Sequence, residues 1–175
     1  MVYVITGGPG FGKTTVLNHL EEKGFLVCEE SARELMSSVR RGNKLTGETA
    51  LPKDFEKIIA SYRMNFLHST GTNTIAFSDR GLPDQVAYSW YKSKIPSDFI
   101  EEKALAERYA QYVFVAPPWK EIYVQDEIRK ETFEEATLIH SLIVKSYHNY
   151  GYETVDLPLT TPVMRVRFIL DFLGV

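Results

Sequence analysis

The residues from Gly7 to Thr14 have the composition and spacing of a phosphate-binding loop. Gly7 is followed by four residues and then by Gly12, Lys13 and Thr14, which is the pattern G-x-x-x-x-G-K-[ST]. Glycines let the backbone wrap around an anion, with N–H groups directed inward at the positive end of the following helix dipole. In such a P-loop the lysine reaches the β- and γ-phosphates and the threonine hydroxyl binds Mg²⁺. The sequence therefore predicts a site for Mg²⁺ and a nucleoside triphosphate.

The segments on both sides of the loop have the patterns of the strand and the helix that flank a P-loop. The run from Val2 to Thr6 is β-branched and aromatic and predicts a buried strand, while the apolar spacing in 15–22 predicts a helix. A dinucleotide-binding loop is disfavoured, because the third glycine of G-x-G-x-x-G would fall on Lys13. We expect the nucleotide to contact Gly8, Pro9, Gly10, Phe11, Gly12, Lys13, Thr14 and Thr15.

The composition indicates a single globular domain over residues 1–175. The chain is 44% hydrophobic, which suffices for a packed core, and its net charge of −3 argues against a general nucleic-acid binder. Cys28 is the only cysteine, so no intrachain disulfide can form. No apolar run is long enough to span a membrane, and the early P-loop leaves no room for a signal peptide. We expect a soluble cytoplasmic protein, with neither nucleic acid nor membrane as partner, and leave a homo-oligomer open.

The rest of the chain alternates predicted strands with predicted helices. The strands are expected at 25–28, 74–78, 112–116 and 152–157. The helices are expected at 31–41, 55–67, 83–91, 96–109, 133–150 and 162–173. The polar segment 42–52 is a loop that either covers the substrate or simply connects two helices. This alternation predicts an α/β fold with a parallel sheet covered by helices on both faces.

Asp79 and Arg80 directly follow the predicted strand 74–78. Ligands bind beyond the carboxyl ends of the strands in such sheets, so these side chains are candidates for the site. Asp79 would hold Mg²⁺, or else help to start the next helix. Arg80 would clamp a phosphate through its planar donors, or else form an ion pair on the surface.

Glu29 and Glu30 follow the predicted strand 25–28. A carboxylate there could take the proton from a substrate hydroxyl, and strand alternation directs at most one of the two into the site. Arg33 lies three residues beyond Glu30 and so on the same side of the predicted helix. A solvated surface position is the alternative for these residues.

The charged segment of about 117–132 has the placement of a lid between the fourth strand and a long helix. Phosphoryl transfer gains from a closing cation, for which Arg129 is the first choice and Lys120 and Lys130 are seconds. A solvated charged face is the alternative. The guanine-specific Asn-Lys-x-Asp pattern is absent, which favours ATP over GTP, and the histidines with Cys28 show no zinc spacing.

Three stretches together resemble a known family. They are Ile5–Thr15, Glu30-Ser31-Ala32-Arg33 and Asp79-Arg80-Gly81-Leu82-Pro83-Asp84. The chain resembles the predicted-ATPase family typified by the kinase domain of NadR and, more distantly, deoxynucleoside and thymidylate kinases. Those kinases have an aromatic residue or serine after the arginine, where this chain has Gly81.

The resemblance implies a three-layer P-loop NTPase with a five-stranded parallel sheet in the order 2-3-1-4-5. It implies that Glu30 contacts or deprotonates the substrate hydroxyl, and that Asp79 and Arg80 serve Mg²⁺ and the phosphates. Arg129 would belong to the lid, and Pro158 would border the base.

Three functions are compatible with these residues. The leading hypothesis is a kinase that transfers the γ-phosphate of ATP, with Mg²⁺, to a small acceptor that the sequence does not identify. The second is an ATPase or nucleotide-dependent switch that acts on a protein or lipid partner. The third is a nucleotide sensor without catalysis.

Overall fold

The fold is a five-stranded parallel sheet with helices on both faces, seen in a computed structural model that describes residues 1–29, 54–125 and 131–175. The expected helix 31–41 and loop 42–52 lie outside the described residues, as do Glu30, Arg33, Arg129 and Lys130.

The strands occur in the predicted order. They are β1 (Val2–Thr6), β2 (Leu26–Cys28), β3 (Ala76–Asp79), β4 (Tyr112–Val115) and β5 (Glu153–Asp156). All four pairings are parallel, in the order β2-β3-β1-β4-β5, which confirms the prediction. Because Ile5 pairs with Asp79 and Thr6 with Val115, the ends of β3, β1 and β4 lie side by side at the carboxyl edge.

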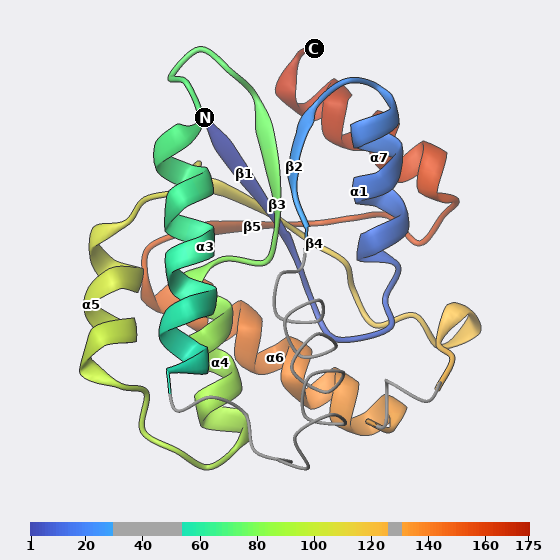
Figure 1. Cartoon of the computed structure of the whole chain (residues 1–175). Helices are drawn as coiled ribbons and strands as arrows, with labels where there is room; N and C mark the ends of the chain where they lie inside the picture. The colour runs from blue at the N-terminus through green and yellow to red at the C-terminus, as the bar shows by residue number, and fades with distance from the viewer. Residues whose placement is uncertain (30–53, 126–130) are drawn as a thin grey trace, which may run out of the picture.

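The helices divide between the two faces of the sheet (Figure 1). They are α1 (Lys13–Glu22), α3 (Phe55–Ser69), α4 (Leu82–Tyr91), α5 (Asp98–Ala106), α6 (Phe133–Asn149) and α7 (Pro162–Leu173), with a short 3-10 helix η1 (Lys120–Ile122). One core joins α1 and α7 to the sheet, and the other joins α3, α4, α5 and α6 to it. No helix in the three described ranges is long and apolar enough to cross a membrane.

The helices start where capping residues stand in the sequence. Thr132 and Glu135 form a capping box at the start of α6, with the Thr132 hydroxyl accepting from Glu135 N at 3.2 Å. The prediction was wrong at the end of α5, which stops at Ala106 instead of reaching Tyr109. The backbone is extended at Glu107, so that Tyr109 turns back into the core, where only 7% of it is exposed.

Candidate functional site

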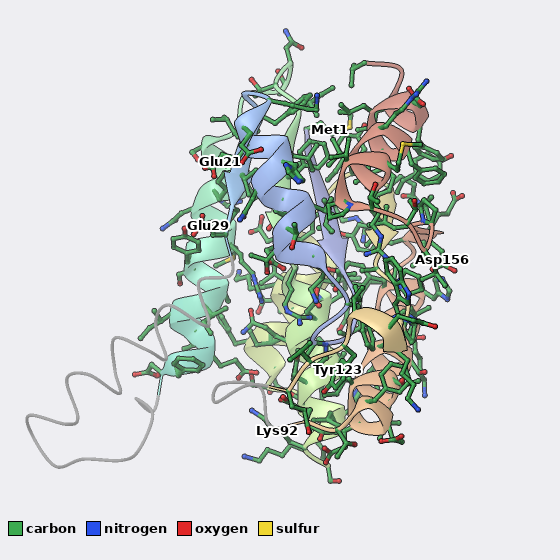
Figure 2. All side chains as sticks on the ribbon, turned by 90° about the vertical axis from the view of Figure 1, so that its right-hand side faces the viewer. Met1, Glu21, Glu29, Lys92, Tyr123 and Asp156 are labelled. Carbon is green, nitrogen blue, oxygen red and sulfur yellow. The ribbon has the colours of Figure 1, made fainter. Side chains whose placement is uncertain are left out.

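A cavity of about 1160 Å³ opens at the carboxyl edge of the sheet. P-loop residues, including Lys13, form one part of its wall, and residues of α3 and α4, including Arg63 and Tyr88, form another. The start of α7 and the segment around η1 complete it. Figure 2 shows Lys92, a cavity residue at the end of α4, at the opposite end of the molecule from Met1. Segments that follow the ends of β1, β3, β4 and β5 thus line the cavity, as expected for a parallel α/β sheet.

The P-loop runs close against the end of β4. Gly7 has φ 126°, and a Cβ there would lie 2.4 Å from the carbonyl oxygen of Ala116, so only glycine fits. The Lys13 ammonium is buried and donates to the Gly8 carbonyl at 2.7 Å, while Thr14 and Thr15 are exposed to the cavity. The loop therefore places Lys13, Thr14 and Thr15 in the wall of the cavity.

The predicted nucleotide contacts are divided between the cavity wall and the core. Six of them line the cavity: Pro9, Gly10, Gly12, Lys13, Thr14 and Thr15. The Phe11 ring is fully buried and packs on Phe133 and His140, so this residue can offer a ligand only its backbone. Gly8 is packed so closely that a Cβ would lie 2.3 Å from the Ala136 carbonyl oxygen. Their roles in nucleotide binding stay predictions.

Asp79 ends β3 beside the P-loop strand and is 3% exposed. It lies at the carboxyl edge of the sheet but is not among the residues that line the cavity, whereas Thr14, the other predicted Mg²⁺ ligand, is. Within the described ranges no three histidine, cysteine or acidic side chains gather into a metal site. A Mg²⁺ ion in an NTPase needs few protein ligands, because phosphates and waters supply the others, so the residues present fit the ion.

Arg80 is fixed in an uncommon backbone conformation. Its φ is 70°, and its N–H donates to the Ile5 carbonyl while the Ser78 hydroxyl donates to its carbonyl. Its guanidinium is 4% exposed, lies over the Tyr88 ring at 5.2 Å and lines the cavity. The surface ion pair considered for Arg80 is therefore wrong. Strained residues of this kind cluster at functional sites.

Asp84 is the residue at the centre of this region, and the sequence reasoning assigned it no role. Its Oδ1 accepts from the Thr6 hydroxyl at 2.5 Å and from Arg80 Nη1 at 2.9 Å. Its Oδ2 accepts from Gly81 N at 2.9 Å and from the Tyr147 hydroxyl at 2.6 Å. The i,i+4 spacing from Arg80 at the start of α4 was a signal that could have identified it.

Close steric contacts explain why a glycine, Gly81, follows Arg80. A Cβ on Gly81 would lie 2.7 Å from the Tyr147 hydroxyl oxygen and 3.0 Å from the Tyr109 ring. An aromatic residue or serine at this position, as in the deoxynucleoside and thymidylate kinases, would displace Tyr147 from Asp84. Burial, followed by the Asp84 charge, raises the pKa of Tyr147 well above its ordinary value, so the phenol stays a donor.

Arg165 of α7 is a second residue that the sequence reasoning missed. It is 1% exposed, and it donates from Nε to the Pro158 carbonyl and from Nη1 to the Phe11 carbonyl, each at 2.8 Å. It also stacks on Trp119 and lines the cavity. The carbonyl of Pro158, the residue predicted to border the base, thus helps to hold this arginine in position. No local sequence signal could reveal Arg165, because Phe11 is 154 residues away.

The lid-like segment is described only in part. Lys120 begins η1 and is exposed, whereas Ile122 and Glu131 line the cavity. The Tyr123 hydroxyl donates to the Glu131 carbonyl across the ends of the segment. Glu29 is exposed at the end of β2.

Fold and site together define a P-loop nucleoside-triphosphate-binding domain. The model of the family described as AAA domain matches residues 2–165, so the chain belongs to this family. No curated protein is similar enough to the sequence to count as a match.

Several solved structures share the fold at low identity. Deoxyadenosine kinase from M. mycoides with bound dATP is 13% identical with a TM-score of 0.65, and all of both chains is covered. Thymidylate kinase from Ehrlichia chaffeensis is 17% identical, with a TM-score of 0.61 and 98% of each chain covered. NadR protein in complex with NR is 19% identical, with a TM-score of 0.68, 99% of this chain and 51% of NadR covered. These structures agree with the resemblance drawn from the motifs.

Proposed function

We propose that the protein is a Mg²⁺-dependent kinase that transfers the γ-phosphate of ATP to a hydroxyl group of a small nucleoside-like or nucleotide-like acceptor. The observation that carries this proposal is that a single cavity joins the P-loop to the wall formed by α3 and α4. Ligand pockets usually measure roughly 300–1,000 Å³, so this cavity has room for a nucleotide and a second substrate. A hydrolase would need no such second compartment.

Each predicted residue has a defined task in this proposal. Lys13 and the loop amides bind the β- and γ-phosphates, and Arg80 stabilises the transferring group from the acceptor side. Thr14 and Asp79 would hold Mg²⁺, which neutralises phosphate charge when bound. Asp84 keeps Arg80 in place before any ligand arrives, because the ion pair is already formed.

The acceptor hydroxyl requires a base, for which we propose Glu30. We further propose that Arg33 assists it, that Arg129 closes over the phosphates and that Pro158 borders the base of ATP. The ligands bound in the structural neighbours support the acceptor class: one deoxyadenosine kinase structure holds dCMP and dCDP as products, and NadR holds NR.

A screen for phosphorylated products tests the proposal. The full chain is incubated with Mg-ATP and a panel of nucleosides, nucleoside monophosphates and ribosides, and products are identified by mass spectrometry. We expect one acceptor class to be phosphorylated, and Lys13→Ala to abolish the product. Lys23→Ala, an exposed lysine at the end of α1, is the matched control. Release of inorganic phosphate alone would favour the ATPase or switch instead.

A further inference from the structure

We propose that Arg63 binds an anionic group of the phosphate acceptor, a carboxylate or a phosphate, and thereby selects acidic acceptors over neutral ones. The proposal rests on the proposed kinase function, since it concerns the acceptor half of the same cavity.

Arg63 lies in the middle of α3 in the wall of the cavity. It is 3% exposed, yet no carboxylate of the described ranges forms an ion pair with it. Its Nη1 donates to Gln85 Oε1 at 3.2 Å, and its buried Nε has no hydrogen-bond partner. A buried charge is normally paired, because desolvation of an unpaired ion is strongly unfavourable. Arg80, in the turn between β3 and α4, follows that rule through Asp84.

Three described ionisable groups that lie near Arg63, namely Cys28, Tyr109 and Tyr147, do not supply the missing charge. Burial raises the pKa of Cys28 to about 11, although Arg63 acts in the opposite direction. Burial likewise raises the pKa of Tyr109 and of Tyr147, both of which also feel the Arg63 charge. All three groups are therefore neutral near neutral pH, and the guanidinium remains uncompensated by them.

One hydrogen bond, to Gln85, orients the guanidinium. Gln85 Nε2 donates to the Glu56 carbonyl at 2.9 Å, which leaves Gln85 Oε1 directed at Arg63. A side chain that is oriented by a neutral amide but not neutralised is prepared for a charged ligand.

The acceptor half of the cavity also has more basic than acidic side chains among its described residues, which favours an anionic ligand. Its described basic residues are Arg63, Lys92 and Lys94, and its acidic ones are Glu56 and Glu131, once the Arg80–Asp84 pair is set aside. A carbonyl oxygen could accept from Arg63 but would leave the positive charge unbalanced. A carboxylate or phosphate supplies both acceptor and charge, and the planar guanidinium suits either group.

Matched pairs of acceptors test the inference. The probes are nicotinate riboside against nicotinamide riboside, for a carboxylate, and dCMP against deoxycytidine, for a phosphate. Each is titrated into the full chain with Mg-ADP present, by calorimetry and thermal shift. In at least one pair we expect the member that carries the additional carboxylate or phosphate to bind about tenfold or more tightly than the member that lacks it. The pair that shows the preference identifies the anionic group.

Variants assign the preference to Arg63. In Arg63→Gln the preference should fall to about threefold or less, whereas Arg63→Lys should keep part of it because the charge remains. Arg167→Gln, an exposed arginine on α7, is the matched control and should behave as wild type. The ligand-free thermal midpoint of Arg63→Gln should equal or exceed that of wild type, because an unpaired buried charge has been removed.

Two outcomes overturn the inference. The first is that the wild type binds ATP but binds neither anionic probe more tightly than its partner probe. Binding of ATP together with binding of none of the four probes counts as the same outcome. The other is an acidic preference that survives in Arg63→Gln. Either result would leave the proposed kinase function standing, whereas loss of Mg-ATP binding by the wild type would contradict the function itself.

Discussion

The Tyr147 hydroxyl donates to Asp84 Oδ2 at 2.6 Å, and both residues are almost fully buried. This bond links α6 to the start of α4, and the other oxygen of the same carboxylate binds Arg80 and Thr6. One carboxylate therefore connects the P-loop strand, the Arg80 turn and the helix that follows the lid-like segment. We infer that it keeps Arg80 aimed at the phosphates.

Asp84→Asn should be strongly destabilising. The amide has one acceptor oxygen where the carboxylate has two, and it removes the Asp84 charge from beside the buried Arg80 guanidinium, at a loss of about 3–5 kcal/mol. Urea unfolding measures the loss, and Asp171→Asn, an exposed aspartate on α7, is the control. A loss no greater than that of the control would show that Asp84 does not hold Arg80.

The effects of Gly81→Ala and Tyr147→Phe on the free energy of unfolding should be coupled. Gly81 has an ordinary φ of −133°, so the new Cβ would destabilise only by contact with the Tyr147 hydroxyl and the Tyr109 ring, about 1–3 kcal/mol. Tyr147→Phe removes that hydroxyl together with its bond to Asp84, at about 1–2 kcal/mol. The double variant should therefore lose less than the sum in a double-mutant cycle. Additivity within about 0.5 kcal/mol would refute the steric explanation of Gly81.

Arg165→Lys should weaken ATP binding. A lysine cannot reach both the Phe11 and Pro158 carbonyls in the same way or stack on Trp119, so the P-loop would lose its brace to α7. We expect a loss of stability of about 1–3 kcal/mol and a higher Kd for Mg-ATP. Arg167→Lys, two residues further along α7, provides the comparison. An unchanged Kd would mean that the brace matters only for folding.

His140 should make stability depend on pH. Burial lowers its pKa below the ordinary 6.5, with Lys13 adding to the effect and Asp156 opposing it. Below pH 6.5 the unfolded chain therefore binds a proton that the folded chain resists, so stability falls as the pH falls towards the lowered pKa of the folded state. The midpoint of thermal unfolding should drop between pH 7 and 5 less steeply in His140→Gln than in wild type. Identical slopes would contradict this account, and His148→Gln, on the exposed side of α6, is the control.

The sequence predicted those features that arise from local patterns. The P-loop spacing, the strand runs and the helical spacing of apolar residues are short-range signals, and the structure confirms the strand order and the helices α1, α6 and α7 that they predicted. The structure also places Asp79 and Arg80 at the predicted edge of the sheet.

Long-range contacts were not predictable in this way. Arg165 acts on a residue 154 positions away, and Tyr147 reaches Asp84 across 63 positions. The charge of Arg63 is unusual only because α3 is buried on that side. Tyr109 was assigned to a helix because its spacing fits one, although core packing draws it out of that helix.

The fate of the γ-phosphate tests the central claim most directly. Phosphorus NMR of wild-type protein with Mg-ATP and the acceptor found by screening should show ADP forming together with a phosphate ester of the acceptor, in equal amounts. Lys13→Ala should show neither product. ADP accompanied only by inorganic phosphate, at a rate that the acceptor leaves unchanged, would contradict the proposal that this cavity carries out phosphoryl transfer between two substrates.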